Sequence, residues 1–403
     1  MTKLKIGILR EEKTPPDKRV PLPPLVCAEL IRKYPNIEIF VQPSQIRCYE
    51  DYEYTSFGVP LKEDLSDCDI LMGVKEVPLD KLIPNKKYFF FSHTIKKQPH
   101  NLKLMKGLIE KKIQMIDYET LTDSHQNRII GFGRYAGIVG AYNAILGYGR
   151  KYDLFILKPA HLCRDRAEME EELKRAKLPN IKIVLTGGGR VANGAIETLS
   201  ALRIRKVTPE EFLMSSFREP VYCQLNPRDY IQRKSDLNFD LQDFYTHPEH
   251  FNSNFLPYTK MADIYIVAHF WDPRAPKMFE LADVAAKDFH MSVIADITCD
   301  IDGSVPTTIR SSTISAPFYG FNTKTSKEDL PFNKDTVCVM AVDNLPCELP
   351  RDASDDFGKD LMERVLPNIT TEDKDQIIER ATICKDGKLT PPFEYLSDYA
   401  YSR

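Results

Sequence analysis

Several polar residues in the first 120 positions follow short apolar runs that are typical of β-strands. Arg10, Lys75, His93 and Glu119 each stand just beyond such a run, and Arg19 follows in the first loop. Because ligands of open α/β sheets bind outside the carboxyl ends of the strands, these side chains converge if the sheet is parallel. An arginine can bind a substrate carboxylate, and lysine and histidine are bases with different pKa values. A nearby glutamate can shift the pKa of both bases. Together they predict an acid/base site, although each residue taken alone is more often solvated or structural.

A second motif is the glycine-rich stretch 182–202, KIVLTGGGRVANGAIETLSAL. An apolar strand runs into Gly187, Gly188 and Gly189, and a helix with Gly194 in its first turns follows. In dinucleotide sites such glycines permit a tight turn and let backbone N–H groups reach the pyrophosphate at the positive end of the helix. The spacing to the last glycine is two residues longer than in the standard fingerprint. A strand–helix turn that binds no ligand therefore remains an alternative interpretation. We assign Gly187, Gly189 and Gly194 to cofactor binding.

The residue that binds the adenosine ribose is expected about 20 residues further on, at the end of the second strand. Thr208 stands there in place of the usual acidic residue, and Arg203, Arg205 and Lys206 lie nearby. These cations would favour a 2′-phosphate. The sequence therefore predicts NAD or NADP without deciding between them.

Segment 131–151 has the pattern of a helix, with Gly133, Gly137 and Gly140 on or near one face. Small residues at this spacing let another helix or strand approach closely. We expect a tightly packed helix between two domains rather than a ligand site.

The elements that must carry these residues are indicated by compact apolar runs. They lie at 4–9, 37–41, 69–74, 88–92 and 113–117, and then at 182–186, 262–269, 292–297 and 335–342. Continuous rather than alternating hydrophobicity indicates strands buried on both faces, as in a parallel sheet flanked by helices. The predicted fold class is α/β, with two Rossmann-like domains, parallel sheets and a cleft between them.

The same pattern predicts how the chain is divided. We expect a discontinuous substrate domain at 1–133 plus 346–403, because the helical stretch after Asn344 is short for a domain of its own. The dinucleotide-binding domain is expected at 134–345. Its polar stretch around 209–258 is long and irregular, so we interpret it as an insertion.

Composition excludes several classes of protein. The 403 residues include 55 basic and 58 acidic side chains, a net charge of −3 that argues against nucleic-acid and polybasic membrane surfaces. No long uncharged apolar run predicts a membrane helix, and the N-terminus has no signal core. Nine irregularly spaced cysteines without a Cys-x-x-Cys pair favour reduced thiols over a metal site or disulfides. We expect a cytoplasmic protein with small-molecule partners and no metal, whose oligomeric state the sequence leaves open.

Several motifs resemble a known family. GILREEKTPPDKRVPLPP, GVKEVP and FFSHT resemble the N-terminal domain of the alanine dehydrogenase and transhydrogenase superfamily. The whole chain is more closely similar to the lysine-forming saccharopine dehydrogenases, and especially to the lysine-ketoglutarate reductase half of the animal bifunctional enzyme. The further motifs that carry this resemblance are IDYE, LTGGGRVANGA, HFWDPRAP, IADITCDIDGS and MAVDNLPCELPRDAS. The resemblance implies a two-domain oxidoreductase that joins lysine to 2-oxoglutarate as an imine and reduces it with NAD(P)H to saccharopine.

The resemblance also implies roles for individual residues. Lys75 would be the acid/base group on the secondary amine, His93 would handle the carbinolamine and water protons, and Arg19 would hold a substrate carboxylate, while Glu119 would adjust the basic cluster. Further positions that match family contacts with the substrate are Lys96, Gln98 and Arg128. Those that match cofactor contacts are Gly189, Arg190, Val342, Asp343, Asn344 and Leu345. Thr186 and Thr208 depart from the fungal pattern, which puts the fungal type of NAD binding in doubt.

Two alternatives remain at this stage. One is an alanine dehydrogenase-like amino-acid oxidoreductase that uses Arg19, Lys75 and His93 on a smaller oxo acid. The other is a non-catalytic regulator that binds a dinucleotide, against which the joint presence of these three residues argues.

Overall fold

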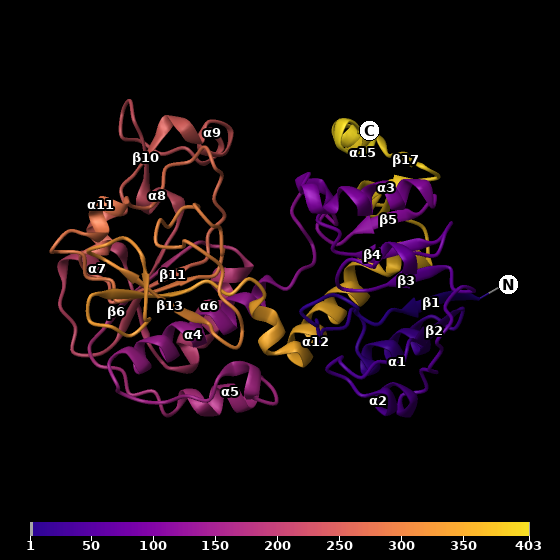
Figure 1. Ribbon diagram of the computed structural model, residues 1–403, viewed down its shortest axis with the longest axis horizontal. Helices are drawn as coiled ribbons and strands as arrows, with labels where there is room; N and C mark the ends of the chain where they lie inside the picture. Colours follow the sequence, from indigo (N-terminus) through magenta and orange to yellow (C-terminus); the bar gives the residue numbers. More distant parts are fainter. Residues whose placement is uncertain (1–2, 403) are drawn as a thin grey trace. The chain divides into compact units, whose positions relative to one another are not determined.

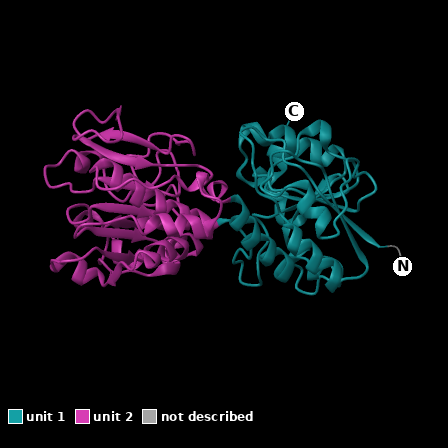
Figure 2. Ribbon diagram, turned by 90° about the horizontal axis from the view of Figure 1, so that it is seen from below, with its two compact units in different colours: residues 1–132, 350–403 teal, residues 133–349 magenta. Residues whose placement is uncertain are grey.

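The computed structural model describes residues 3–402 and divides the chain into two compact units. Unit 1 comprises the chain up to Phe132 together with the part from Pro350 onward, and unit 2 comprises Gly133–Leu349 (Figure 2). Each unit has a hydrophobic core of its own. The chain therefore leaves unit 1 once, builds unit 2 in one continuous stretch, and returns.

Unit 1 is built on a seven-stranded sheet of order β17-β16-β5-β4-β3-β1-β2 (Figure 1). Its five parallel strands are β1 (Leu4–Ile8), β2 (Ile37–Val41), β3 (Ile70–Met72), β4 (Lys87–Phe90) and β5 (Gln114–Asp117). Every one of them was predicted from a continuous apolar run, and most of their residues are buried. Because these strands are parallel, their carboxyl ends lie at one edge of the sheet.

The returning C-terminal segment completes unit 1. Strand β16 (Thr382–Lys385) pairs antiparallel with β5 and with β17 (Lys388–Leu389). Proline residues open α1 (Pro24–Lys33), where the missing N–H costs no hydrogen bond. The other helices of unit 1 are α2 (Asp51–Ser56), α3 (Leu102–Glu110), α12 (Pro350–Asp360), α13 (Pro367–Thr370), α14 (Ile377–Ala381) and α15 (Ser397–Ala400), and its shorter turns are η1 (Leu79–Lys81), η2 (Thr94–Lys96), η3 (Pro99–Asn101), η7 (Leu361–Val365) and η8 (Pro391–Leu396).

Unit 2 contains an eight-stranded sheet of order β14-β13-β15-β12-β11-β6-β8-β7. The parallel strands are β6 (Lys182–Thr186), β7 (Arg205–Val207), β8 (Val221–Leu225), β11 (Ile264–Val267), β12 (Val293–Asp296) and β15 (Thr336–Met340). Two antiparallel strands, β13 (Phe318–Asn322) and β14 (Glu328–Asp329), extend one side. The prediction of an α/β fold with two Rossmann-like sheets is confirmed.

The order of strands in unit 2 differs from the standard one. Strand β8 lies directly beside β6, and β7 is the edge strand beyond it. In the standard order 3-2-1-4-5-6 the second strand would be the neighbour of the first. Strand β8 also lies inside the stretch 209–258 that was expected to be an insertion. Only the part after Leu225 leaves the sheet, so the expected insertion is shorter than predicted.

This part of the chain, residues 226–259, is called the excursion below. It contains a two-stranded sheet of β9 (Ile231–Arg233) and β10 (Phe251–Ser253). It also contains α8 (Pro227–Tyr230), α9 (Leu241–Thr246), η5 (Pro248–His250) and α10 (Leu256–Thr259). Phe251 and Phe255 are fully buried and tie the excursion to the core of unit 2.

The long helix α4 (Gly133–Lys151) packs against α6 (Arg190–Ala201) within unit 2 (Figure 1). A Cβ on Gly137 would lie 1.9 Å from the carbonyl oxygen of Val191, so only glycine permits this approach. The expected close packing of this segment is found, but its partner is a helix of the same unit. The remaining helices of unit 2 are α5 (Arg166–Leu173), α7 (Pro209–Met214) and α11 (Leu281–Val284), with turns η4 (Ala160–Leu162) and η6 (Leu345–Glu348).

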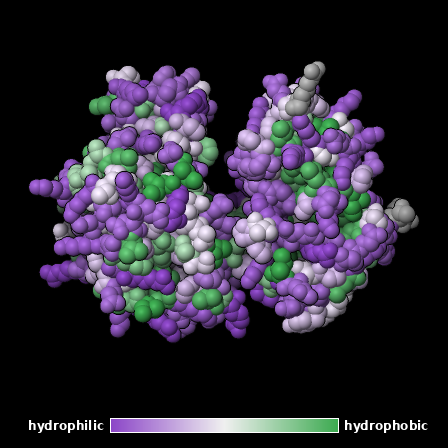
Figure 3. All heavy atoms as spheres, viewed as in Figure 1, coloured by the Kyte–Doolittle hydropathy of each residue, from purple (hydrophilic) through white to green (hydrophobic). Residues whose placement is uncertain are grey.

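Hydrophilic side chains cover most of the face drawn in Figure 3, and apolar residues form scattered patches between them. Within residues 3–402 the helices are too short or too polar to cross a membrane.

Candidate functional site

The carboxyl edge of the unit 1 sheet brings together three of the predicted residues. Lys75 follows β3, His93 follows β4, and Glu119 follows β5. Arg10 follows β1 but forms ion pairs with Glu63 and Glu12. The strand ends therefore supply a lysine, a histidine and a carboxylate, as the sequence predicted.

Glu119 joins His93 and Lys96 into one cluster. Its Oε2 lies 3.3 Å from the Nδ1 of His93, and its Oε1 lies 3.4 Å from the Nζ of Lys96. Burial alone would raise the pKa of Glu119, but the hydrogen bond to His93 and the charges of Lys96 and Arg128 outweigh it and lower this pKa to about 2. Glu119 is thus ionised at neutral pH and orients the imidazole through Nδ1.

Asp117 fixes the two loops that carry this cluster. Its Oδ2 accepts the backbone N–H of Ser92 at 2.9 Å, and its Oδ1 accepts that of Glu119 at 2.7 Å. The carboxylate is fully buried at the end of β5. His93 itself has a left-handed backbone with φ of 54°, a conformation uncommon outside glycine. Sequence reasoning missed Asp117 because an acidic residue at the end of a strand has no distinctive pattern.

The aromatic ring of Phe91 lies under the cluster. The His93 ring stacks on it with centroids 6.3 Å apart, and the Arg128 guanidinium lies 5.4 Å from its centroid. The Nε of Arg128 donates to the carbonyl of Ile130. Gln98, another predicted contact, accepts a hydrogen bond from Asn101 through its side chain at 3.4 Å.

Arg19 is held by a neighbouring carboxylate. Its Nε and Nη2 donate to Asp17 at 3.0 and 2.6 Å, and its guanidinium lies 4.2 Å from the centroid of the Phe132 ring. Both partners of the pair are buried. Burial opposes ionisation of Asp17, but the charge and hydrogen bonds of Arg19 hold its pKa well below its usual range. The Nε/Nη2 edge of the Arg19 guanidinium therefore binds Asp17 within the protein, which the sequence did not predict.

Lys75 is positioned through its backbone. The N–H groups of Val74 and Lys75 donate to the two oxygens of Glu11, at 2.6 and 2.9 Å. Among the described residues, the Nζ of Lys75 has no hydrogen-bond partner. Burial, followed by the positive charge of Arg19, lowers the pKa of the Lys75 ammonium. A small cavity of about 150 Å³ adjoins Lys75 and Glu11.

Glu11 is a second residue that sequence reasoning missed. Burial and the charge of Asp17 raise its pKa to about 8, although the two backbone N–H groups act in the opposite direction. Glu11, Asp17 and Arg19 are buried, and the partly buried Lys75 adjoins them.

Unit 2 contains a larger cavity of about 930 Å³ at the turn after β6. Its walls come from the glycine turn, the turn after β8, the segment after β11 and the excursion. Gly187 has φ of +116°, and a Cβ there would lie 2.4 Å from the carbonyl oxygen of Ala268. Helix α6 begins at Arg190 with Gly189 as its uncapped N-cap residue. Its first N–H groups have no side-chain partner from that cap and suit an anion.

Thr208 is not at this cavity. It caps α7, where its Oγ1 accepts the N–H of Glu211 at 3.1 Å and its own N–H donates to the Glu211 carboxylate. Because β8 separates β7 from β6, the strand end beside the glycine turn is Asn226. The assignment of Thr208 to the cofactor is therefore corrected to the turn that begins at Asn226.

The turn after β8 is closely packed against the glycine turn. A Cβ on Gly188 would lie 2.9 Å from the Oδ1 of Asn226. The N–H of Asn226 donates to Asp229 at 2.7 Å in a capping box that opens α8. Arg228, between them, is exposed, lines the cavity and has no ion-pair partner within residues 3–402. The turn thus presents a neutral amide at the strand end, followed by the cation of Arg228 and by the Asp229 carboxylate, which also lines the cavity.

The predicted assignment of Gly194 to cofactor binding also requires correction. A Cβ on this residue would lie 1.9 Å from the carbonyl oxygen of Arg134 in α4. Its role is therefore the close contact between α6 and α4. Val342 and Leu345 follow β15 with buried side chains, so they can meet a ligand only through backbone atoms, whereas Asp343 is exposed and Asn344 half-buried.

A buried histidine at the end of β11 completes the cavity wall. The Nδ1 of His269 lies 2.7 Å from the Oγ1 of Thr186, and its Nε2 lies 3.0 Å from the Oγ of Ser304. Burial lowers the pKa of His269 to about 4, so the ring is neutral at pH 7. The sequence offered only the HFWDPRAP motif as a signal for this residue.

Comparison with known proteins supports the resemblance. Residues 7–139 match the family model described as alanine dehydrogenase/PNT, N-terminal domain. The alpha-aminoadipic semialdehyde synthase of Arabidopsis thaliana is 30% identical over 97% of this chain and 41% of its own length. The mitochondrial protein of the same name from Mus musculus is 26% identical over 99% of this chain and 48% of its length. This chain therefore spans less than half the length of these two relatives.

A third relative has a similar length. The saccharopine dehydrogenase [NAD(+), L-lysine-forming] of Emericella nidulans is 24% identical over 89% of this chain and 90% of its own length. Among solved structures, an L-alanine dehydrogenase superposes with a TM-score of 0.66 at 17% identity, covering 98% of this chain and all of the other. A transhydrogenase from Sinorhizobium meliloti gives 0.62 at 13% identity, covering 96% of this chain and all of the other. These structures share the fold.

Proposed function

We propose that the chain interconverts saccharopine with L-lysine and 2-oxoglutarate by hydride transfer with NAD(P), most effectively with NADP(H). Unit 1 holds the substrates and unit 2 holds the dinucleotide. The observation that carries the proposal is the cluster of Lys75, His93 and Glu119 at one edge of the unit 1 sheet, with the Arg19–Asp17 pair beside it.

The reaction forms a C=N bond between the ε-amine of lysine and the keto carbon of 2-oxoglutarate, with loss of water. When bound, the dinucleotide supplies or accepts the hydride that interconverts this imine and the secondary amine of saccharopine. Lys75 takes the amine proton in the oxidative direction and returns it in the reductive one. Its lowered pKa makes the neutral form accessible nearer to neutral pH, as a general base requires.

His93 transfers the protons of the carbinolamine and of water. The ionised Glu119 holds its Nδ1 and stabilises the imidazolium that forms, and Nε2 carries the exchanged proton. Lys96 is about half exposed beside this pair, so it is suited to a carboxylate of the substrate. Gln98, Arg128 and Arg19 complete the proposed contacts to the substrate.

The cavity of unit 2 suits the dinucleotide. The pyrophosphate fits the N–H groups at Gly187–Arg190, where helix α6 begins with a positive dipole. The Val342–Leu345 segment follows β15, a parallel strand of the same sheet that is separated from β6 by β11 and β12, and its backbone atoms are proposed to meet the other end of the dinucleotide. The adenosine end meets the turn after β8, where the cation of Arg228 can pair with a 2′-phosphate, while the Asp229 carboxylate of the same turn accepts the N–H of Asn226. This supports NADP(H) over NAD(H).

The test is a steady-state assay of the full chain with two substrate pairs and two cofactors. NADPH and NADH oxidation are measured with lysine plus 2-oxoglutarate, and in parallel with ammonia plus pyruvate. We expect turnover with the first pair and a higher kcat/KM for NADPH. Turnover with ammonia and pyruvate alone would instead identify an alanine dehydrogenase-like enzyme. Tight dinucleotide binding without turnover in either assay would contradict the proposal.

A further inference from the structure

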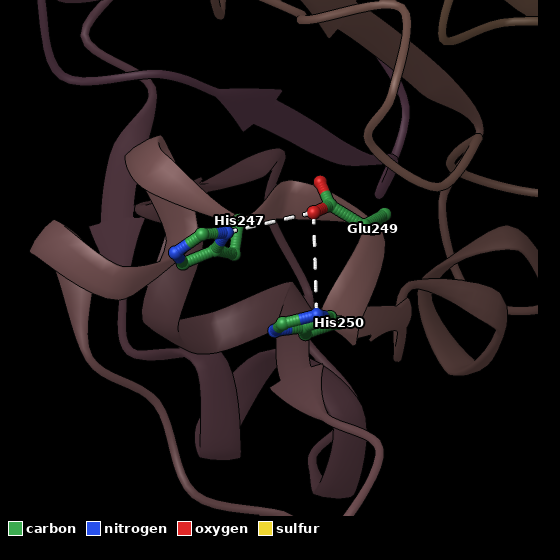
Figure 4. Close-up of side chains that lie close together, drawn as sticks. All are labelled: His247, Glu249 and His250. Atoms are coloured by element: carbon green, nitrogen blue, oxygen red, sulfur yellow. Dashed lines mark ion pairs between the residues drawn. The ribbon is translucent and has the colours of Figure 1, made fainter.

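The excursion of unit 2 places three side chains of metal-ligating type on one short turn. His247, Glu249 and His250 flank or belong to η5, and Figure 4 shows both imidazoles directed at one carboxylate oxygen. The Oε1 of Glu249 lies 3.6 Å from the Nδ1 of His247 and 4.0 Å from the Nε2 of His250. All three candidate ligand atoms lie within 4.8 Å of one another.

We infer that these three residues form a surface site for a divalent transition metal of the Zn²⁺, Cu²⁺ or Ni²⁺ class. Nitrogen and oxygen ligands lie about 2.0–2.2 Å from zinc, which puts neighbouring ligand atoms roughly 3.4 Å apart in a tetrahedron. The two distances to Glu249 need to contract by only a few tenths of an ångström. Two imidazoles and a carboxylate are a donor set of zinc sites that keep a position open for water.

The backbone that carries these ligands is well fixed. Pro248, between the first two, is buried in the wall of the large cavity, and the next residue after the turn is the fully buried Phe251. The N–H of His247 donates to Asp243, that of His250 donates to His247, and that of Lys234 donates to His250. Only the side chains must therefore move when a metal binds.

The imidazoles are able to make that movement. Their rings stack with centroids 5.1 Å apart and planes 17° apart, so at least one must turn before both lone pairs converge on a metal. Both side chains are more than half exposed, which leaves room for the rotation. Among the described residues, neither ligand nitrogen has a hydrogen bond to any group other than the nearby Glu249.

One nearby cation competes for the carboxylate. The Nη1 of Arg274 lies 3.9 Å from the other oxygen of Glu249, while its Nη2 is paired with Asp272 at 2.8 Å. A divalent metal binds the deprotonated carboxylate and the neutral imidazoles. Imidazole ligands disfavour Mg²⁺ and Ca²⁺, which prefer oxygen.

The experiment is a titration of the tag-free full chain with Zn²⁺ by calorimetry, with Co²⁺ absorption as a second readout. We expect one site, a Co²⁺ spectrum typical of nitrogen and oxygen ligands, and no comparable binding of Mg²⁺. H247Q, H250Q and E249Q should each weaken Zn²⁺ binding about tenfold or more. H125Q, at an exposed histidine in unit 1, is the matched control and should leave binding unchanged, and R274Q should tighten it.

Several results would overturn the inference. These are the absence of saturable Zn²⁺ binding in the wild type, unchanged binding in the H247Q/H250Q double variant, and a loss in H125Q equal to that in H247Q. None of these variants touches the residues proposed for catalysis. Circular dichroism of each variant checks that unit 2 remains folded, and Arg274 provides a test in which binding is gained.

Discussion

The Oγ1 of Thr186 lies 2.7 Å from the Nδ1 of His269, and both atoms are buried. The two residues end or follow the adjacent parallel strands β6 and β11. Because the second ring nitrogen of His269 meets Ser304 at 3.0 Å, the neutral imidazole joins three segments at the edge where the glycine turn begins. The Thr186 hydroxyl therefore ties the end of β6 to His269 directly before the glycine turn.

This relationship predicts that Thr186 and His269 act together on the cofactor turn. T186V and H269Q should each weaken dinucleotide binding by up to about tenfold, because a buried hydrogen bond typically contributes ~1 kcal/mol and its unpaired partner costs more. The double variant should lose less than the sum of the two. Calorimetric titration with NADPH, without substrates, measures this coupling, and strictly additive losses would contradict it.

Arg228 is predicted to select the cofactor. R228Q should lower the affinity for NADPH and for 2′,5′-ADP about tenfold or more, since it removes a charge-assisted contact to the 2′-phosphate. The affinity for NADH should change little. Direct binding measurements keep this test separate from the identity of the amino-acid substrate. The matched control is R218Q, at an exposed arginine that precedes β8 and does not line the cavity. Equal losses for NADPH and NADH in R228Q would argue against the assignment.

Lys75 and His93 are predicted to be needed for turnover but not for cofactor binding. K75M and H93Q should each lower kcat roughly 10²–10⁴-fold, the usual range for loss of a general acid or base. Dinucleotide affinity should remain close to that of the wild type, because the unit 2 cavity contains neither residue. Undiminished steady-state rates in both variants would refute the proposed roles.

The sequence predicts the strands, and the polar residues that follow them, because both depend on local patterns. A continuous apolar run marks each central strand, and Lys75, His93 and Glu119 stand at the ends of such runs. The order of the strands in the unit 2 sheet, by contrast, does not follow from local patterns. Strand β7, Arg205–Val207, is short with two exposed residues of three, so no apolar run indicates it. Nothing local reveals that β8 pairs with β6 in its place, and for this reason the sequence points to Thr208 and gives no signal for Asn226.

Two other differences between the sequence-based predictions and the structure arise from packing. The sequence shows that Asp17 and Arg19 are two residues apart but not that burial pairs them, which changes how Arg19 can meet a substrate. Gly194 fits a phosphate-binding fingerprint as well as a helix crossing, and only the position of α4 distinguishes the two. Both cases depend on contacts between segments that no spacing rule specifies.

Glu11 predicts a pH dependence of stability. Its folded-state pKa is raised to about 8, so its contribution to stability is fully present below its unfolded value of ~4.3 and is lost as pH rises through about 8. The free energy of unfolding should therefore fall between pH 5 and 8 by an amount on the order of a few kcal/mol from this group. Urea unfolding of the wild type and of E11Q at several pH values measures it. An identical slope in both proteins would contradict the prediction.

Alanine substitutions at two glycines of the fingerprint, Gly189 and Gly194, are predicted to have different effects. In G194A the added methyl group would meet the backbone of α4, 1.9 Å from the Arg134 oxygen, so stability should fall by about 3 kcal/mol or more. In G189A no atom lies within 4 Å of the new Cβ and the backbone φ of −89° suits alanine, so folding should change little. Its methyl group would nevertheless stand where the pyrophosphate approaches helix α6, and NADPH binding should weaken. Thermal unfolding and NADPH titration of both variants separate the two roles, and loss of stability in G189A would show that the turn cannot accept a side chain.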